Sequence, residues 1–201
     1  TSLISWQKAV IYIALDTSML WDEFCHIRLS VIYRGRAVPL VWKTIRHGSS
    51  TVAFETYKDL LLQAGKLLPL DAQVVFLADR GFADTSLMKY LNQTLHWHWR
   101  IRIKSSFYVY RDQRRIKISN IKLKRGEAFF LHNVHITEKR FGTVHLALAK
   151  PHGIKESWFI VSDEPTDLHT FDEYGFRFDI EENFLDDKSG AFQLEASLFR
   201  S

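Results

Sequence analysis

The sequence predicts an α/β fold combined with a β-rich segment. Apolar runs rich in β-branched residues, at 10–15 and 74–78, alternate with stretches whose apolar residues recur at helical spacing. From about residue 105 to 163 the chain instead consists of short strand-like runs separated by turn residues. Alternating strands and helices are typical of α/β domains, whereas consecutive short strands indicate antiparallel β structure.

Three strands and a helix are predicted in the first third of the chain. A hairpin turn at Arg34 and Gly35 separates the second and third strands, and the helix is predicted because its apolar residues form a stripe along one face. The predicted strands are 10–15, which ends at Asp16, 27–33 and 37–42, and the helix runs from a cap at 49–51 to about Lys66.

The remaining elements follow the same reasoning. The strand at 74–78 is apolar throughout, which predicts that it is buried on both faces. The predicted elements are this strand, which ends at Asp79, a helix that begins at Asp84 or Thr85, a strand at 99–104, the strand-like runs of 105–163, a helix from 165–167 through Lys188, and a second helical stretch at 191–200.

Composition places the chain among globular proteins. Its 201 residues are 46% hydrophobic and 25% charged, which excludes a disordered tail, a collagen-like rod and a disulfide scaffold. The single cysteine, Cys25, cannot form an intrachain disulfide, so we expect a reducing compartment. No apolar run could span a bilayer and no secretory leader is visible, so we expect no membrane partner. The abrupt start and the uncapped helical pattern at the end predict a piece of a longer protein.

Charge is distributed in two blocks of opposite sign, within a net charge of +4. Residues 163–188 hold ten acids and two bases. Such blocks could bind cations and phosphates, although two solvated faces of opposite charge would give the same pattern. Residues 99–125 hold one acid, Asp112, and ten bases, namely Arg100, Arg102, Lys104, Arg111, Arg114, Arg115, Lys117, Lys122, Lys124 and Arg125.

Two predicted strands end in an aspartate, Asp16 and Asp79. The carboxyl end of a buried strand lies at the rim of a sheet, where open α/β folds place their ligands. If the two strands are adjacent, the carboxylates lie close together and their repulsion favours a divalent cation. The alternative is structural: Asp16 could cap a turn and Asp79 could pair with Arg80.

A polar stripe is predicted on the helix near the end of the chain. Residues spaced at i, i+3, i+7 and i+14 fall within an arc of about 60° on a helix. This stripe consists of Tyr174, Arg177, Glu181 and Lys188. By its pattern alone, the solvent face of an amphipathic helix is the favoured interpretation.

The stripe and the two aspartates together resemble the catalytic signature of IS4-type DDE transposases. The stripe matches the Y-R-E-K signature of that family at every spacing. Asp16, in Leu-Asp-Thr, resembles the first catalytic aspartate, and Asp79, in Asp-Arg-Gly-Phe, resembles the second. The order of the acids and the long gap before Glu181 also agree, and the similarity covers nearly the whole chain.

This resemblance implies an RNase H-like fold. The family has a mixed five-stranded sheet whose first three strands are antiparallel, flanking helices, and a β-rich insertion before the last catalytic helix. Transferred to this chain, residues 1–104 are the first part of the core, 105–163 are the insertion, and 164–201 are the second part of the core with the signature helix.

The resemblance also implies an activity, namely cut-and-paste DNA transposition by phosphodiester hydrolysis and 3′-OH strand transfer at transposon ends. Asp16, Asp79 and Glu181 are then the catalytic residues and the ligands of two Mg²⁺ ions, for which Mn²⁺ can substitute. The expected partners are double-stranded DNA, as transposon end and target, and a second copy of the chain in a synaptic homodimer. The expected location is the bacterial cytoplasm, at the nucleoid.

Four further residues are expected to contact DNA. By the resemblance, Tyr174, Arg177 and Lys188 hold phosphates near the transposon end, and the basic block 99–125 follows the DNA backbone. Relatives that form a DNA hairpin often have Trp after the signature Arg, where it holds a flipped base. Here that residue is Phe178, which can still stack.

Other residue types give weaker signals. His96 and His98, and His132 and His135, lack a third metal ligand at a recognisable spacing, so structural roles are favoured over zinc binding. Core packing is favoured for Trp97, Trp99 and Trp158, although a second base-stacking Trp is expected in or near the insertion. Cys25 is predicted to be a small buried residue.

Two other functions remain open on the sequence alone. One is a catalytically silent RNase H-like protein that only binds DNA, against which the presence of all three acids argues. The other is a different RNase H-like nuclease, against which the Y-R-E-K spacing argues.

Overall fold

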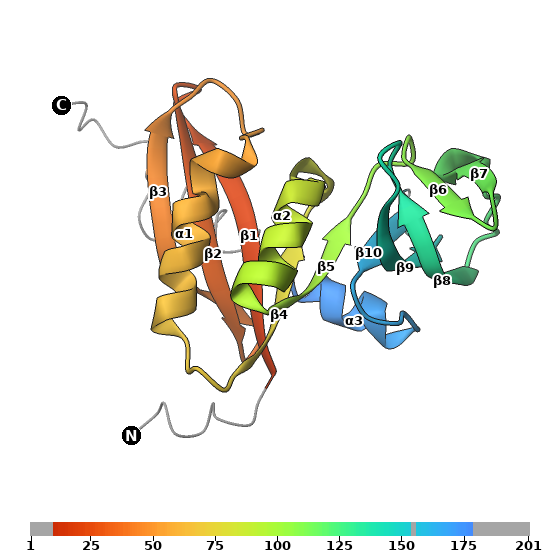
Figure 1. Ribbon diagram of the computed structural model, residues 1–201. Coiled ribbons are helices and arrows are strands. Elements are labelled where there is room, and N and C mark those ends of the chain that lie inside the picture. Colours follow the sequence, from red (N-terminus) through yellow and green to blue (C-terminus); the bar gives the residue numbers. More distant parts are fainter. Residues whose placement is uncertain (1–9, 154–155, 179–201) are drawn as a thin grey trace. The chain divides into compact units, whose positions relative to one another are not determined.

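The computed structural model describes residues 10–153 and 156–178 (Figure 1). The chain divides into two compact units, of which the first comprises Thr1–Leu77 and Phe176–Ser201 and the second Ala78–Gly175. The first unit is therefore built from two separate stretches of chain. The division into 1–104, 105–163 and 164–201 follows the segments of the family that the sequence resembles. It does not describe compact units, and it stays a prediction. Among the described helices, none has both the length and the apolar character needed to cross a membrane.

The first unit contains a sheet with strand order β3-β2-β1-β4 and a helix packed against it (Figure 1). Strands β1 and β2 pair antiparallel, as do β2 and β3, which confirms the arrangement expected for the first three strands. Helix α1 contacts β2 and β3. The elements are β1 (Val10–Leu20), β2 (Phe24–Tyr33), β3 (Arg36–Arg46), α1 (Phe54–Leu67) and β4 (Gln73–Ala78).

Apolar periodicity explains why these residues form these elements. Ala14 of β1, Ala37 of β3, and Val75 and Leu77 of β4 form a buried cluster. The apolar stripe predicted for the helix is confirmed, because the apolar face of α1 is buried and its other residues are exposed or half-buried. The buried residues of α1 are Phe54, Tyr57, Leu60, Leu61 and Ala64.

The hairpin between β2 and β3 is also confirmed. Tyr33 pairs with Arg36, which leaves Arg34 and Gly35 as a two-residue connection. Their φ angles are +52° and +71°. A type I′ turn requires two successive residues with positive φ, and its twist matches that of the flanking strands.

Several predicted boundaries in this unit are wrong: β2 begins before residue 27 and β3 continues past residue 42, and the structure gives a reason for two further differences. Strand β1 does not end at Asp16 but continues to Leu20, because its polar residues pair with the first residues of β2, as far as Leu20 opposite Phe24. Helix α1 has Ala53 at its N-cap, with no side-chain hydrogen bond. The predicted cap fails because Ser49 Oγ accepts from the Thr51 backbone N–H at 3.0 Å, which forms a local turn before the helix.

The second unit is mainly antiparallel β structure, as predicted for residues 105–163. Its strand order is β5-β10-β9-β8-β6-β7, and every neighbouring pair is antiparallel. Asp84 caps α2, as predicted, by accepting from the Ser86 N–H at 2.7 Å. The elements are η2 (Arg80–Phe82), α2 (Thr85–Tyr90), η3 (Leu91–Leu95), β5 (His98–Arg102), β6 (Tyr108–Arg111), β7 (Arg114–Lys117), η4 (Ile118–Asn120), β8 (Ala128–Ile136), β9 (Phe141–Ala149), β10 (Trp158–Ser162) and α3 (His169–Gly175).

The described residues form ten strands, so the expected five-stranded sheet is wrong as a count. In the structure β5 pairs with β10, with Ile160 opposite Arg102 and Ser162 opposite Arg100. An unpaired edge strand exposes a row of backbone hydrogen-bonding groups, and β10 satisfies those of β5. Within the second unit, the predicted insertion therefore pairs directly with β5 through β10.

Candidate functional site

Asp16, the first predicted catalytic residue, lies within β1 directly opposite Arg28 of β2. Opposed residues of an antiparallel pair project to the same face of the sheet. The Asp16 side chain is 16% exposed, and its Oδ1 accepts from the Thr17 backbone N–H at 2.8 Å. Arg28 is buried. A carboxylate is therefore fixed on a mostly buried strand position beside a buried cation.

Arg177, from the predicted signature, is placed next to this carboxylate. Its Nη1 lies 3.3 Å from Asp16 Oδ2, although 161 residues separate the two in the sequence. The Arg177 side chain is only 3% exposed. The preceding residue, Phe176, packs edge-to-face on Tyr12 of β1, with ring centroids 4.9 Å apart. The structure thus brings two of the predicted site residues together through contacts with one strand.

The expected continuous helix from 165–167 through Lys188 is wrong in two respects among the described residues, because helix α3 begins at His169 and ends at Gly175. Phe176 and Arg177 follow it as a turn. Glycine is a poor helix former, and the contacts of Phe176 and Arg177 with β1 require the chain to leave the helix. Tyr174 and Arg177 therefore do not share one uninterrupted helical face.

Tyr174 and Phe178 have different environments. Tyr174 is fully buried in the second unit, where it packs with Ala147 and Ile160 and lies 5.8 Å from the Trp158 ring. Phe178 is half-buried, and the guanidinium carbon of Arg177 lies 5.3 Å from its ring centroid. The expected DNA contacts of both residues stay predictions.

Asp79, the second predicted catalytic residue, directly follows β4, the neighbour of β1 in the first unit. It caps η2, with Oδ1 accepting from the Arg80 backbone N–H at 2.5 Å. The Arg80 side chain is directed elsewhere, with Nη1 3.6 Å from Glu156 Oε2. Asp79 therefore contacts Arg80 through the backbone N–H, whereas the side-chain ion pair that was the structural alternative is replaced by one between Arg80 and Glu156. The third acid, Glu181, and Lys188 lie outside the described residues.

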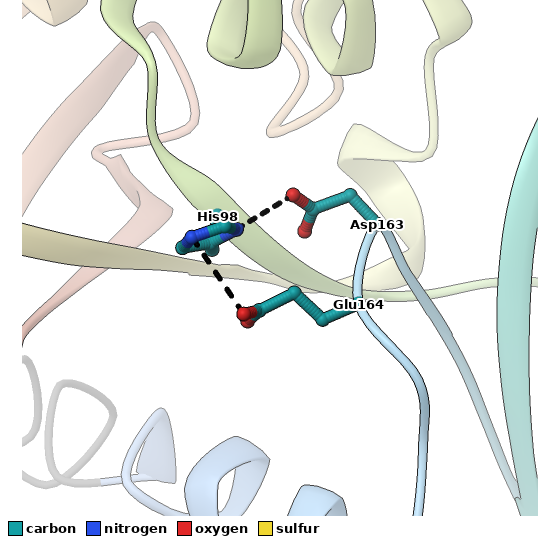
Figure 2. Close-up of side chains that lie close together, drawn as sticks. All are labelled: His98, Asp163 and Glu164. Carbon is teal, nitrogen blue, oxygen red and sulfur yellow. Dashed lines mark hydrogen bonds and ion pairs between the residues drawn. The ribbon is translucent and has the colours of Figure 1, made fainter.

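The structure also contains a cluster of potential metal ligands that the sequence did not predict. His98, Asp163 and Glu164 each place a potential ligand atom within 4.8 Å of the others (Figure 2). His98 Nδ1 lies 2.8 Å from Asp163 Oδ2, and His98 Nε2 lies 3.6 Å from Glu164 Oε1. One nitrogen and two carboxylates are a donor set that could hold a divalent cation.

The pairing of β5 with β10 creates this cluster. Because Ser162 pairs with Arg100, the residues that follow β10 lie beside the start of β5. Asp163 Oδ1 also accepts from the Trp99 backbone N–H at 2.9 Å. The sequence signals were His98 and the acidic block, but 65 residues separate His98 from Asp163, so no local spacing connected them.

Arg100, a buried residue of β5, forms ion pairs with two glutamates of the acidic block 163–188. Its Nε lies 2.8 Å from Glu173 Oε2, and its Nη2 lies 2.8 Å from Glu164 Oε2. Burial lowers the pKa of the Arg100 guanidinium, but the hydrogen bond to Glu164 and the negative charge of Glu173 outweigh it, so the pKa is raised. The two charge blocks are therefore not simply two solvated faces, because part of each is neutralised by the other.

Cys25 and two of the tryptophans have the structural roles that the sequence favoured. Cys25 is fully buried, and burial raises the pKa of its thiol, which opposes formation of a reactive thiolate. Trp99 is also fully buried and donates from Nε1 to Asn92 Oδ1 at 2.7 Å. Trp97 is 6% exposed.

Comparison with known proteins adds evidence at the level of the fold. No protein-family model and no curated protein sequence matches this chain. A solved structure of the piggyBac transposase synaptic complex with hairpin DNA is similar, with a TM-score of 0.58 and 10% sequence identity. The similarity covers 92% of this chain but 43% of that one, so the chain spans less than half of that transposase. An Argonaute of Marinitoga piezophila aligns only at a TM-score of 0.37, with 13% identity. The chain thus has a mixed α/β fold similar to part of a DNA transposase.

Proposed function

We propose that this chain is part of the catalytic region of a DDE-type DNA transposase, which cuts DNA at transposon ends and transfers the freed 3′-OH to target DNA. The likeness to piggyBac transposase supports the fold that this function needs. The function itself rests on the three acids and the Y-R-E-K spacing, because at 10% identity the likeness concerns the fold alone.

The observation that carries the proposal is the contact of Arg177 with Asp16. The signature segment and the first catalytic aspartate are far apart in the sequence, yet Arg177 Nη1 and Asp16 Oδ2 lie 3.3 Å apart. One signature residue, Arg177, therefore contacts the residue that is proposed as the first catalytic acid. Asp79 follows the neighbouring strand β4, as expected for the second acid.

The chemistry of these side chains fits Mg²⁺. Asp16 and Asp79 supply carboxylate oxygens, which are the ligands that Mg²⁺ prefers. A carboxylate has about four lone-pair sites, so a hydrogen bond from Arg177 does not prevent Asp16 from also binding a cation. Bound there, two divalent ions would activate the attacking oxygen and stabilise the leaving oxygen of the phosphodiester. Glu181 is proposed as the third ligand.

The remaining signature residues are proposed to orient the DNA. Arg177 fixes Asp16 and its guanidinium could also donate to a phosphate, as Lys188 would with its ammonium group. Phe178 is proposed to stack on a base. Tyr174 is proposed to contact a phosphate, which from its buried position requires the chain around Gly175 to open.

One observation favours a second candidate function, a silent DNA-binding relative. Asp16 forms an ion pair with the buried Arg177 and lies opposite Arg28 on the neighbouring strand, and a carboxylate in such surroundings is also typical of a structural ion pair. The two candidates differ in whether Asp79 is needed for DNA cleavage, since a silent protein has no cleavage to lose.

The experiment that separates them is metal-dependent nicking. The full-length protein is incubated with DNA that carries the ends of its own element, in Mg²⁺ or Mn²⁺, and nicked products are resolved by electrophoresis. We expect nicking by the wild type and none by Asp79→Ala, while Asp112→Asn, an exposed acid of the second unit, should be unaffected. Absence of wild-type nicking, or equal nicking by Asp79→Ala, would contradict the proposal.

A strand-transfer assay distinguishes a transposase from another nuclease. A labelled duplex with a free 3′-OH transposon end is mixed with a plasmid, and joined product is measured. A transposase inserts the end into the plasmid, whereas a hydrolytic nuclease produces only cuts.

A further inference from the structure

The second unit contains a groove lined largely by cationic side chains. Its volume is about 890 Å³, and its walls come from η2, from β5 and η4 with the segments that follow them, from the residue after β9, and from the start of β10 with the residues before it. Four serines add hydroxyl groups, and Ile103 and Phe159 are among the apolar residues of the wall. The charged lining residues are Arg80, Arg102, Lys104, Lys122, Lys150 and Glu156.

The charge of this groove is unbalanced. Five lining residues are cations and one is an acid. Lys104, Lys122 and Lys150 form no ion pair with any residue that the structure describes. Three like charges gathered around one cavity repel each other, so the groove is suited to a ligand with several negative charges.

Glu156 occupies a special place in this groove. A single oxygen, Oε2, lies 2.7 Å from Arg102 Nη2 and 3.6 Å from Arg80 Nη1. One anionic oxygen shared between two guanidiniums is also how a phosphate oxygen is commonly held. The Glu156 side chain is 56% exposed, so it can leave this position for solvent without a large rearrangement.

We propose that the groove binds the sugar–phosphate backbone of DNA, and that a phosphate displaces Glu156 from Arg80 and Arg102. The three lysines contact successive phosphates, and the apolar wall faces the deoxyribose. The groove begins at Arg80, the residue after Asp79, so the bound backbone passes beside the second predicted catalytic acid. The identification of the polyanion as DNA rests on the proposed function.

The first test removes the unpaired lysines. Binding of the full-length protein to a labelled duplex of arbitrary sequence is measured by fluorescence anisotropy over a range of salt concentrations. Each phosphate contact contributes a slope of about −0.9 in log K against log salt, which corresponds to about 8-fold in affinity at 0.1 M salt. For Lys104→Ala/Lys122→Ala/Lys150→Ala we expect a slope shallower by about 2.7, which at 0.1 M salt corresponds to binding about 500-fold weaker.

The matched control is Lys58→Ala/Lys66→Ala/Lys89→Ala. These lysines lie on α1 and α2, outside the groove lining, and their removal changes the net charge equally. Circular dichroism establishes that both triple variants are folded. If the groove variant keeps the wild-type slope, or loses no more affinity than the control, the groove does not bind the backbone.

The second test uses a variant that should bind DNA more tightly than the wild type. Glu156→Gln keeps the shape of the side chain but removes the competing charge, so we expect binding to tighten by up to about 8-fold at 0.1 M salt. Unchanged or weaker binding would refute the displacement of Glu156.

These outcomes are distinct from failure of the proposed function. If the wild type neither nicks nor transfers DNA but the groove variants show the expected slopes, the transposase proposal fails and the groove stands. If nicking depends on Asp79 while the slopes do not change, the groove proposal fails alone. Tighter binding of RNA than of duplex DNA in the same assay would overturn the choice of DNA.

Discussion

The ion pair between Asp16 and Arg177 gives the sharpest prediction about stability. Three variants are compared with the wild type: Asp16→Asn, Arg177→Met and the double variant. Asparagine keeps the size of the aspartate without its charge, and methionine keeps much of the arginine's length. The quantity of interest is the coupling energy, which is the amount by which the effects of the single variants fail to add.

The expected size of the coupling follows from distance and burial. At 3.3 Å and an effective dielectric constant of about 20, two unit charges attract by about 5 kcal/mol, from which the cost of dehydrating both must be subtracted. Removing one partner of a buried pair costs about 3–5 kcal/mol. We expect about 3 kcal/mol for Arg177→Met, at the low end because Arg28 lies opposite Asp16. The expected coupling energy is about 2 kcal/mol or more.

Equilibrium urea unfolding measures the four free energies. The matched control is the pair Lys43 and Asp59, whose charged atoms are 3.1 Å apart but whose side chains are 38% and 52% exposed. Water screens this pair, so its coupling energy should be below about 1 kcal/mol. If the Asp16 and Arg177 variants add to within about 0.5 kcal/mol, the two side chains do not stabilise each other and the anchoring of the signature segment to β1 is wrong.

Three more predictions concern single positions. Arg100→Met should destabilise the protein by about 3 kcal/mol in urea unfolding because Glu173 loses its buried partner, and Glu173→Gln in the same background should recover part of this loss. His145 has a pKa that is lowered by burial first and then by the charge of His132, so folding favours its neutral form. Stability should therefore fall as the pH drops below about 6.5, and His145→Phe should lose less thermal stability than the wild type between about pH 7 and pH 5. Gly35→Ala should cost about 1 kcal/mol in thermal unfolding, because its φ of +71° is strained for alanine although no atom lies within 4 Å of the added Cβ, whereas Gly35→Asn should cost less.

The parts of the fold that the sequence predicted depend on local patterns. The run at 74–78 is apolar at every position and forms a buried strand, and the turn at Arg34 and Gly35 needs only residues that accept positive φ. The helical stripe of α1 was likewise visible in the spacing of its apolar residues. Each of these features is decided within about a dozen neighbouring residues.

The parts that the sequence missed depend on partners far away in the chain. The polar end of β1, from Thr17, is a strand only because β2 pairs with it. The helix break after Gly175 depends on the contacts that Phe176 and Arg177 make with β1. His98 acquires its carboxylates through the pairing of β5 with β10, and periodicity contains no information about which strands pair.

The interruption of the first unit has a consequence for its synthesis on the ribosome. Asp16 is translated 161 residues before Arg177, with the whole second unit encoded between them. At about 5–20 residues per second, the nascent strand β1 waits roughly 8–32 s for the residue that neutralises it. During that interval β5 to β9 of the second unit are made, whereas α3 ends at Gly175, only two residues before Arg177. The contact of Arg177 with Asp16 on β1 is therefore expected to form late, at about the time when the chain of the second unit is complete.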